Sequence, residues 1–269
     1  ARTWRTYRRS AMGVTGLAFL LVALTCRRLG VPPWAAACVL LTAVLAGHER
    51  FFARPDMFSN LGTAWTVFAY HALGQGCMRG RWRWALLLPL GQVLWTNLHG
   101  GFILGLLIGL AFLVGTLLNH LTRSSARDAG VPVAVPGTMP WTAAVLAASA
   151  LACLANPYGW RLAVYPFPEV PIGTSGPGHS LFLQSIAEWQ SPFSKWDVSS
   201  PVLFAFYAWC LLWILVLLLR GPRADFRGVC LALGLSVLAA SARRHIVLDV
   251  LVTAPFLARE LWRAGAEAP

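Results

Sequence analysis

The run PVLFAFYAWCLLWILVLLL, residues 201–219, contains no charged side chain and no regular alternation of apolar and polar residues. A helix needs about 20 predominantly apolar residues to cross a hydrocarbon core roughly 30 Å thick. Within lipid, only helices and closed barrels satisfy all of their backbone polar groups, and barrel strands alternate in polarity. This run therefore predicts a membrane-spanning helix.

Comparable runs occur along the whole chain. The sequence is 57% hydrophobic and 12% charged, with a mean hydropathy of +0.62, whereas about 25% of the residues of a soluble domain are charged. We therefore predict one all-α domain over residues 1–269, a polytopic integral membrane bundle with about nine transmembrane helices. The expected helices lie near 10–26, 31–47, 58–78, 84–97, 100–120, 140–155, 201–219, 228–242 and 245–259, the last being rather amphipathic.

The chain is strongly basic, with 22 Lys and Arg against 10 Asp and Glu and a net charge of +12. These charges lie mostly in short connections between apolar runs. That arrangement indicates membrane topology and contact with anionic lipid headgroups, and we expect no nucleic-acid partner. The six cysteines lie almost entirely within apolar runs and form no CxxC pair, so we interpret them as small packing residues.

Arginine distribution predicts which side each connection faces. Nine crossings sort the connections into two sets, and excess Lys and Arg mark the cytoplasmic set. The richer set contains Arg27, Arg28, Arg79, Arg81, Arg83, Arg123, Arg127, Arg220, Arg223, Arg227, Arg259 and Arg263. The other set contains only Arg50, Arg54, Arg161, Lys195, Arg243 and Arg244. Under this count, the N-terminal part of the chain faces outward, although it contains the arginines at positions 2, 5, 8 and 9. An interfacial helix before residue 10 would explain this exception. We predict a multi-pass protein of the plasma membrane.

The chemically unusual segments share the predicted outer side, where a site could be built from several loops. They are HERFFARPDMFS (48–59), WTNLHGG (95–101), NPYGW (156–160), IAEWQSPF (186–193) and ARRH (242–245).

The first of these segments combines Arg50, Arg54 and Asp56 at a helix mouth broken by Pro55. Guanidinium groups offer paired donors that suit a phosphate. Asp56 could act as a catalytic base, hold a divalent cation or simply pair with Arg54. The alternative is an interfacial ion pair with no role in binding.

Two further segments supply candidate residues. Asn97 and His99 precede two glycines at a helix break, so they could bind substrate, or His99 could only cap a helix. Glu188 is a candidate catalytic acid beside Trp189, in a segment whose aromatic residues suit either sugar stacking or an interfacial belt.

Arg243, Arg244 and His245 place positive charge on the predicted outer side, against the overall trend. An anionic substrate would explain this, and so would anionic lipid. We expect Arg54 and Arg244 to approach one cavity. The sequence contains no P-loop, no metal-ligand spacing and no nucleophile elbow, and it identifies no cofactor beyond the divalent cation that Asp56 could hold.

The order of six segments resembles bacterial multi-spanning glycosyltransferases of the GT-C class, related to the protein mannosyltransferase family. The segments are CRRLG (26–30), RPDMFS (54–59), LWTNLHGGFILG (94–105), NPYGWRL (156–162), IAEWQSP (186–192) and RRHIVL (243–248). The resemblance implies transfer of a sugar from a polyprenyl-phosphate-linked donor at the outer membrane interface, with Arg54 and Asp56 near the lipid phosphate.

The resemblance also implies a principal catalytic acid in a first outer loop, and no matching segment is present. The chain starts at Ala1 with an arginine-rich stretch. We interpret it as a fragment that is inactive by itself.

Two other functions stay open at this point. A transporter or flippase for an anionic lipid-linked substrate would use the same arginines, although the polar residues within the spans are few: Thr66, His71, Gln92 and Asp249. A membrane scaffold would use helix faces rich in glycine, such as Gly101, Gly105 and Gly109.

Overall fold

The computed structural model describes residues 2–51, 54–75, 78–123, 138–164, 186–194, 197 and 199–267. These residues form helices and connections and no strand, which confirms the all-α prediction. Each of the nine expected segments contains a helix. The long helices are α1 (Arg2–Arg28), α2 (Pro33–Gly47), α3 (Asp56–Gln75), α4 (Met78–Leu98), α5 (Ile103–Arg123), α6 (Thr138–Ala152), α9 (Pro201–Arg220), α10 (Phe226–Ser241) and α11 (Ile246–Ala266).

Three stretches of helix among the described residues are long and apolar enough to cross a membrane. They are Ala11–Arg28, Gly100–Thr122 and Pro201–Arg223, and the helices Thr138–Ala152 and Phe226–Ser241 are apolar but shorter. The fold thus agrees with a membrane protein.

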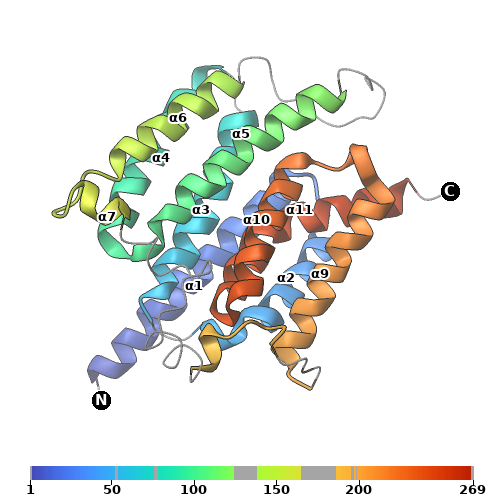
Figure 1. The fold of residues 1–269 in the computed structure, drawn as a ribbon, viewed down its shortest axis with the longest axis horizontal. Coiled ribbons are helices and arrows are strands. Elements are labelled where there is room, and N and C mark those ends of the chain that lie inside the picture. The colour runs from blue at the N-terminus through green and yellow to red at the C-terminus, as the bar shows by residue number, and fades with distance from the viewer. Residues whose placement is uncertain are drawn as a thin grey trace.

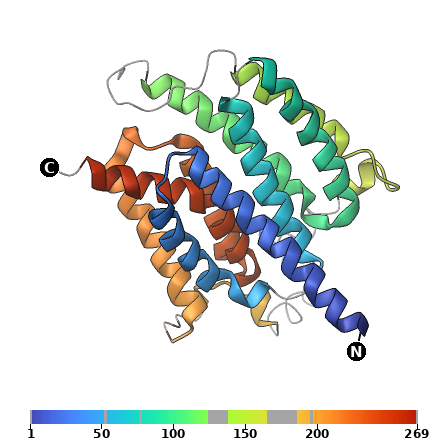
Figure 2. The same cartoon turned by 180° about the vertical axis from the view of Figure 1, so that it is seen from behind.

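The helices form two packed groups (Figures 1 and 2). Helices α3, α4, α5 and α6 pack together, and α2, α9, α10 and α11 form the other group. Helix α1 crosses the back of the bundle and contacts both α3 and α11, while α5 packs against α10. These contacts join the two groups into one body.

Helix α11 lies at the centre of the bundle. It contacts α1, α2, α3, α9 and α10, and every residue from Ile246 to Glu260 is buried. A helix buried on all sides cannot have a solvated face, so the amphipathic character of this segment has another cause. Its polar residues are partnered inside the protein: Ser236 Oγ on α10, for example, donates to Asp249 Oδ2 at 3.0 Å.

Two helices extend into stretches that we expected to be connections. Helix α1 is continuous from Arg2, so the arginines before residue 10 do not belong to a separate interfacial helix. Helix α4 begins at Met78 and includes Arg79, Arg81 and Arg83. Arginine is a good helix former, so an arginine cluster need not end a helix.

A network of ion pairs joins α9, α10 and α11 at the end of the bundle where α9 finishes. Asp225 Oδ2 pairs with Arg227 Nη2 at 2.6 Å and with Arg259 Nη1 at 2.5 Å, and Arg220 Nε pairs with Glu260 at 3.2 Å. Burial raises the pKa of Asp225, but the two arginines hold it well below its usual range. These three arginines bind internal acids, so their assignment to lipid headgroups was wrong.

Candidate functional site

The other end of the bundle carries four short 3-10 helices that come together around the start of α3. They are η1 (His48–Arg50), η2 (Gly100–Phe102), η3 (Ala187–Trp189) and η5 (Arg243–His245). The backbone N–H of Arg243 donates to the carbonyl of Gln190 at 3.0 Å, which ties η3 to η5. Four of the five unusual segments therefore meet at one place, as the sequence predicted.

Arg50 links the two candidate catalytic carboxylates. Its guanidinium forms ion pairs with both Asp56 and Glu188, and its side chain is only 10% exposed. Arg54 Nη1 lies 3.1 Å from Glu188 Oε2, and the Arg54 side chain is 50% exposed. The alternative in which Asp56 pairs with Arg54 is therefore wrong. Arg50 therefore holds the two carboxylates together. It also lines the smaller cavity described below, and its Nε is buried without a hydrogen-bond partner among the described residues, so its contact with a substrate stays a prediction.

His99 connects Asp56 to a serine. His99 Nε2 lies 3.3 Å from Asp56 Oδ1, and His99 Nδ1 lies 2.6 Å from Ser59 Oγ. The backbone N–H of Gly101 also donates to Nδ1, at 3.1 Å. Nδ1 is therefore the acceptor, and the ring proton is on Nε2, directed at Asp56. His99 caps η2 with the same nitrogen, so the capping role and the contact with Asp56 coexist.

Asp56 is held in its charged form. The hydrogen bond from His99 lowers the pKa of Asp56 to about 2, burial opposes this shift, and the positive charges of Arg50 and Arg244 add to it. A carboxylate with such a low pKa is a weak proton acceptor. It is well suited to orient a hydroxyl group or to stabilise positive charge that develops on a substrate.

Gly101 permits the close approach of these groups. A Cβ atom at this position would lie 2.3 Å from Ser59 Oγ and 3.3 Å from His99 Nδ1. A Cβ atom on the neighbouring Gly100 would meet nothing within 4 Å. The two glycines therefore have different roles, and only Gly101 is required by packing.

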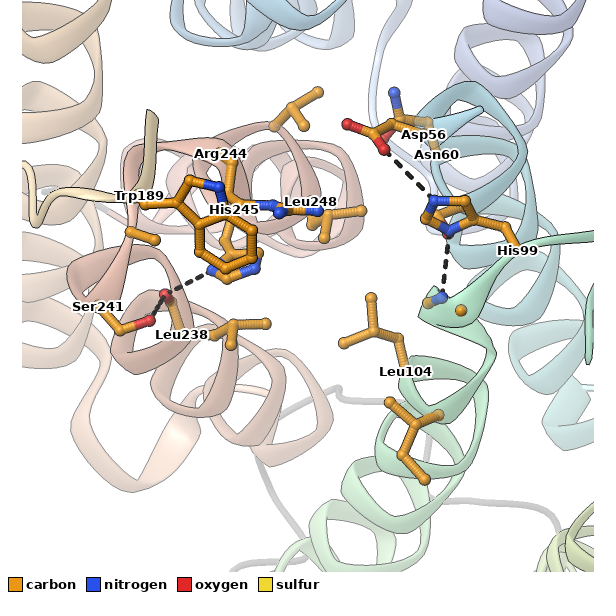
Figure 3. Close-up of a pocket in the computed structure, with 16 residues that line it drawn as sticks. Asp56, Asn60, His99, Leu104, Trp189, Leu238, Ser241, Arg244, His245 and Leu248 are labelled. Carbon is orange, nitrogen blue, oxygen red and sulfur yellow. Dashed lines mark hydrogen bonds and ion pairs between the residues drawn. The ribbon is translucent and has the colours of Figure 1, made fainter. Parts of the chain in front are cut away.

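The larger of two cavities at this end has a volume of about 350 Å³. It lies between α3, η2 and the start of α5 on one side and η3, η5, α10 and α11 on the other (Figure 3). One part of its lining is polar, and the rest is apolar. The polar side chains are those of Asp56, Ser59, Asn60, His99, Ser241, Arg244 and His245, and the apolar ones include Ile103, Leu104, Leu238, Val247 and Leu248.

The smaller cavity, of about 180 Å³, is cationic. Its charged lining residues are Arg50, Arg54, Arg243 and Arg244 against Glu49 and Glu188. Arg54 and Arg244 share this cavity, which confirms that prediction. Arg244 also lines the larger cavity, and its guanidinium carbon lies 4.1 Å from the centre of the Trp189 ring. Arg244 is therefore the residue common to both spaces.

Comparison of the chain with protein-family models, with curated proteins and with solved structures gives no match.

Neither cavity is lined by Asn97 or by the NPYGW segment, although both were predicted to belong to the site. Asn97 Nδ2 donates to the carbonyls of Val93 at 2.8 Å and Ala155 at 2.9 Å, so it ties the end of α4 to the segment after α6. It lines neither of these two cavities, so the structure places it outside the group of residues that form the site. The NPYGW segment forms a local turn in which Asn156 bonds to Cys153 and Gly159. Residues 165–185 and Lys195 lie outside the described residues.

His245 and Arg243 line different cavities of the site. His245 lines the larger cavity, where its Nδ1 lies 3.1 Å from the carbonyl oxygen of Leu238. Arg243 lines the smaller cavity, and its Nε is buried without a hydrogen-bond partner among the described residues. Both were predicted to bind substrate, and both lie where a ligand of these cavities would contact them.

The sequence analysis missed Ser59 and Asn60. Both follow Asp56 by about one helical turn, at the i+3 and i+4 positions that share a helix face. That spacing was visible in the sequence once Asp56 was a candidate. The described residues contain no group of three or more His, Cys, Asp or Glu side chains that could hold a metal ion. The residues around Asp56 therefore offer no ready set of ligands for the divalent cation that the sequence suggested.

Proposed function

We propose that the protein is a membrane glycosyltransferase that transfers a sugar from a polyprenyl-phosphate donor at the outer face of the plasma membrane. In this proposal all nine long helices cross the membrane, and the end carrying the four 3-10 helices faces outward. The observation that carries the proposal is the bridge from Asp56 through Arg50 to Glu188, where a cationic cavity lies beside a larger, partly polar one.

The cationic cavity suits the phosphate of the donor. Arg54, Arg243 and Arg244 line it, and guanidinium groups offer paired donors to phosphate oxygens. When the bond to the sugar breaks, negative charge grows on the leaving phosphate, and fixed cations nearby lower the energy of that state. The lipid chain would remain in the surrounding bilayer.

The transfer itself exchanges one bond for another. The oxygen of the acceptor hydroxyl attacks the anomeric carbon while the bond from that carbon to the phosphate oxygen breaks, and the phosphate keeps the electron pair. The acceptor proton passes to a carboxylate and then to water. We assign this role to Glu188, which lines the cationic cavity and whose side chain is 37% exposed. Asp56 stays ionised and stabilises the positive charge that develops at the sugar carbon.

Three glycines that suggested the scaffold alternative pack within the chain. Added Cβ atoms at Gly101, Gly105 and Gly109 would lie within 2.5 Å of side chains of Ser59, Gln92 and Tyr70 respectively. These three glycines therefore do not support the scaffold alternative.

The test uses the complete gene product in lipid nanodiscs with a radiolabelled polyprenyl-phosphate hexose and native membrane extract as the acceptor source. We expect loss of donor, release of polyprenyl phosphate and appearance of labelled product, and all three should depend on Arg54. In sealed vesicles, movement of intact donor across the membrane without cleavage would identify a transporter and overturn the transferase proposal.

A further inference from the structure

Asn60 is a buried polar side chain with no protein partner among the described residues. It lies in the second turn of α3, one turn after Asp56, and is 2% exposed. Neither its amide nitrogen nor its amide oxygen makes a hydrogen bond. Buried polar groups are nearly always paired because leaving them unpaired is costly, so an unpaired amide is informative where it borders a space that a ligand could fill.

The amide belongs to the wall of the larger cavity. Asn60 lines that cavity together with Asp56 and His99, and Trp189 faces them from the opposite side (Figure 3). A volume of about 350 Å³ falls within the roughly 300–1,000 Å³ range of small-molecule sites. The space is large enough for a ring-sized molecule.

The lining indicates the chemistry of that molecule. A primary amide offers two donors and a carbonyl acceptor side by side, so it matches a group that both donates and accepts. Adjacent hydroxyl groups of a sugar ring do both. The indole of Trp189 is an amphipathic surface that suits the C–H face of such a ring, and Leu104 and Leu248 provide apolar walls.

We propose that Asn60 is a specificity-determining residue that hydrogen-bonds two neighbouring hydroxyl groups of a hexose ring lying against Trp189 in the larger cavity. This inference deepens the proposed function and rests on it for the identity of the ring, which is the sugar of the donor. Arg244 lines both cavities, so a phosphate in the smaller cavity and its sugar in the larger one can belong to one molecule. Asp56 then lies beside the ring, one helical turn from Asn60.

The experiment measures binding separately from transfer. The probes are uncharged methyl hexosides and polyprenyl phosphate, and the complete gene product is held in nanodiscs free of glycosidic detergent. Saturation-transfer NMR reports the hexosides, and a fluorescent polyprenyl phosphate reports the anion. We expect Asn60→Leu to weaken hexoside binding about tenfold or more, since two hydrogen bonds are lost, and to leave polyprenyl-phosphate binding unchanged.

Thr96→Val is the matched control. The Thr96 hydroxyl is also buried and unpartnered among the described residues, but Thr96 lines neither cavity. Both substitutions replace a polar group with an apolar one of similar size. Thr96→Val should leave the binding of both probes unchanged, and both variants should melt at or above the wild-type temperature, because each removes an unsatisfied buried group.

Each failure has its own meaning. Equal hexoside binding by wild type and Asn60→Leu would overturn the role of Asn60. Binding of polyprenyl phosphate without any hexoside binding would overturn the sugar site and leave the anion site standing. Hexoside binding that depends on Asn60 in a protein that never cleaves donor would support the site and reject the transferase.

Discussion

His99 Nε2 lies 3.3 Å from Asp56 Oδ1, although the two residues are separated in the chain by the whole of α3 and α4. On its other side the imidazole contacts Ser59, so it is held between two residues of the first turn of α3. This contact orients a carboxylate that Arg50 also holds.

Asp56→Asn should reduce sugar transfer by roughly 10²-fold or more, because it removes the charge that stabilises the developing positive centre. The substitution keeps the size of the side chain, so folding should be preserved. The measurement is turnover per correctly folded protein, with folding checked by size-exclusion profile in detergent. Asp197→Asn, at a carboxylate that lines neither cavity, should retain wild-type turnover. Equal turnover in the Asp56 and Asp197 variants would make Asp56 an interfacial anchor only.

Arg54→Lys should lower turnover strongly even though it preserves the charge. Lysine lacks the planar pair of donors that holds a phosphate in one orientation, and loss of one such donor costs roughly 10²-fold in comparable sites. The Michaelis constant for the lipid donor should rise as well. Steady-state kinetics over a range of donor concentrations will separate the two effects, and unchanged values of both would remove Arg54 from the phosphate site.

The Asp56–His99 contact should stabilise the folded protein only while Asp56 is ionised, so the stability should fall at acidic pH. The folded pKa of Asp56, about 2, lies below the ordinary aspartate value of 3.8. The stabilisation is therefore complete above about pH 4 and is lost as the pH falls toward 2. Melting temperatures measured from pH 7 to pH 2 should fall more steeply for wild type than for Asp56→Asn across this window. Parallel curves would show that the carboxylate contributes nothing to folding.

Gly101→Ala should impair the site without unfolding the protein, since its new methyl group would push Ser59 and His99 apart. Gly100→Ala is the natural comparison because a Cβ atom there meets nothing within 4 Å. We expect lower turnover for the Gly101 variant and near wild-type turnover for the Gly100 variant. If the two variants behave alike, the packing at Gly101 is unimportant for function.

The buried ion pairs at the opposite end should matter for stability and not for chemistry. Removing one partner of a buried pair costs about 3–5 kcal/mol because the other charge is left uncompensated. Asp225→Asn would leave the buried charges of Arg227 and Arg259 without the carboxylate that compensates them. The free energy of unfolding should fall accordingly, with turnover per folded molecule unchanged. A variant as stable as wild type would show that water or another group replaces the carboxylate.

The topology can be checked with single cysteines at the two ends of the bundle. Ser194→Cys lies just after η3, and Ala266→Cys ends α11; both positions are exposed. In intact cells an impermeant thiol reagent should label the first, and the second only after permeabilisation, with unmodified protein as the control for native cysteines. Labelling of both from one side would reject the proposed crossings.

The sequence by itself determined the all-α class and the approximate position of the nine long helices among the described residues, because long apolar runs leave the backbone no other way to satisfy its polar groups. It also showed that Arg54, Asp56, Glu188 and Arg244 belong to segments of one kind. It did not show which charges pair, since a short motif carries no information about partners far along the chain.

Tertiary structure alone decided those pairings. Arg50 contacts Glu188, which lies 138 positions later in the sequence. Asn97 donates a hydrogen bond to the carbonyl of Ala155 and lines neither cavity. Arginines expected at lipid headgroups are buried against Asp225 and Glu260 instead. Hydropathy decides which segments become helices, but the partner of each buried charge depends on how those helices pack, because ion pairs act over a few ångströms and only packing sets those distances.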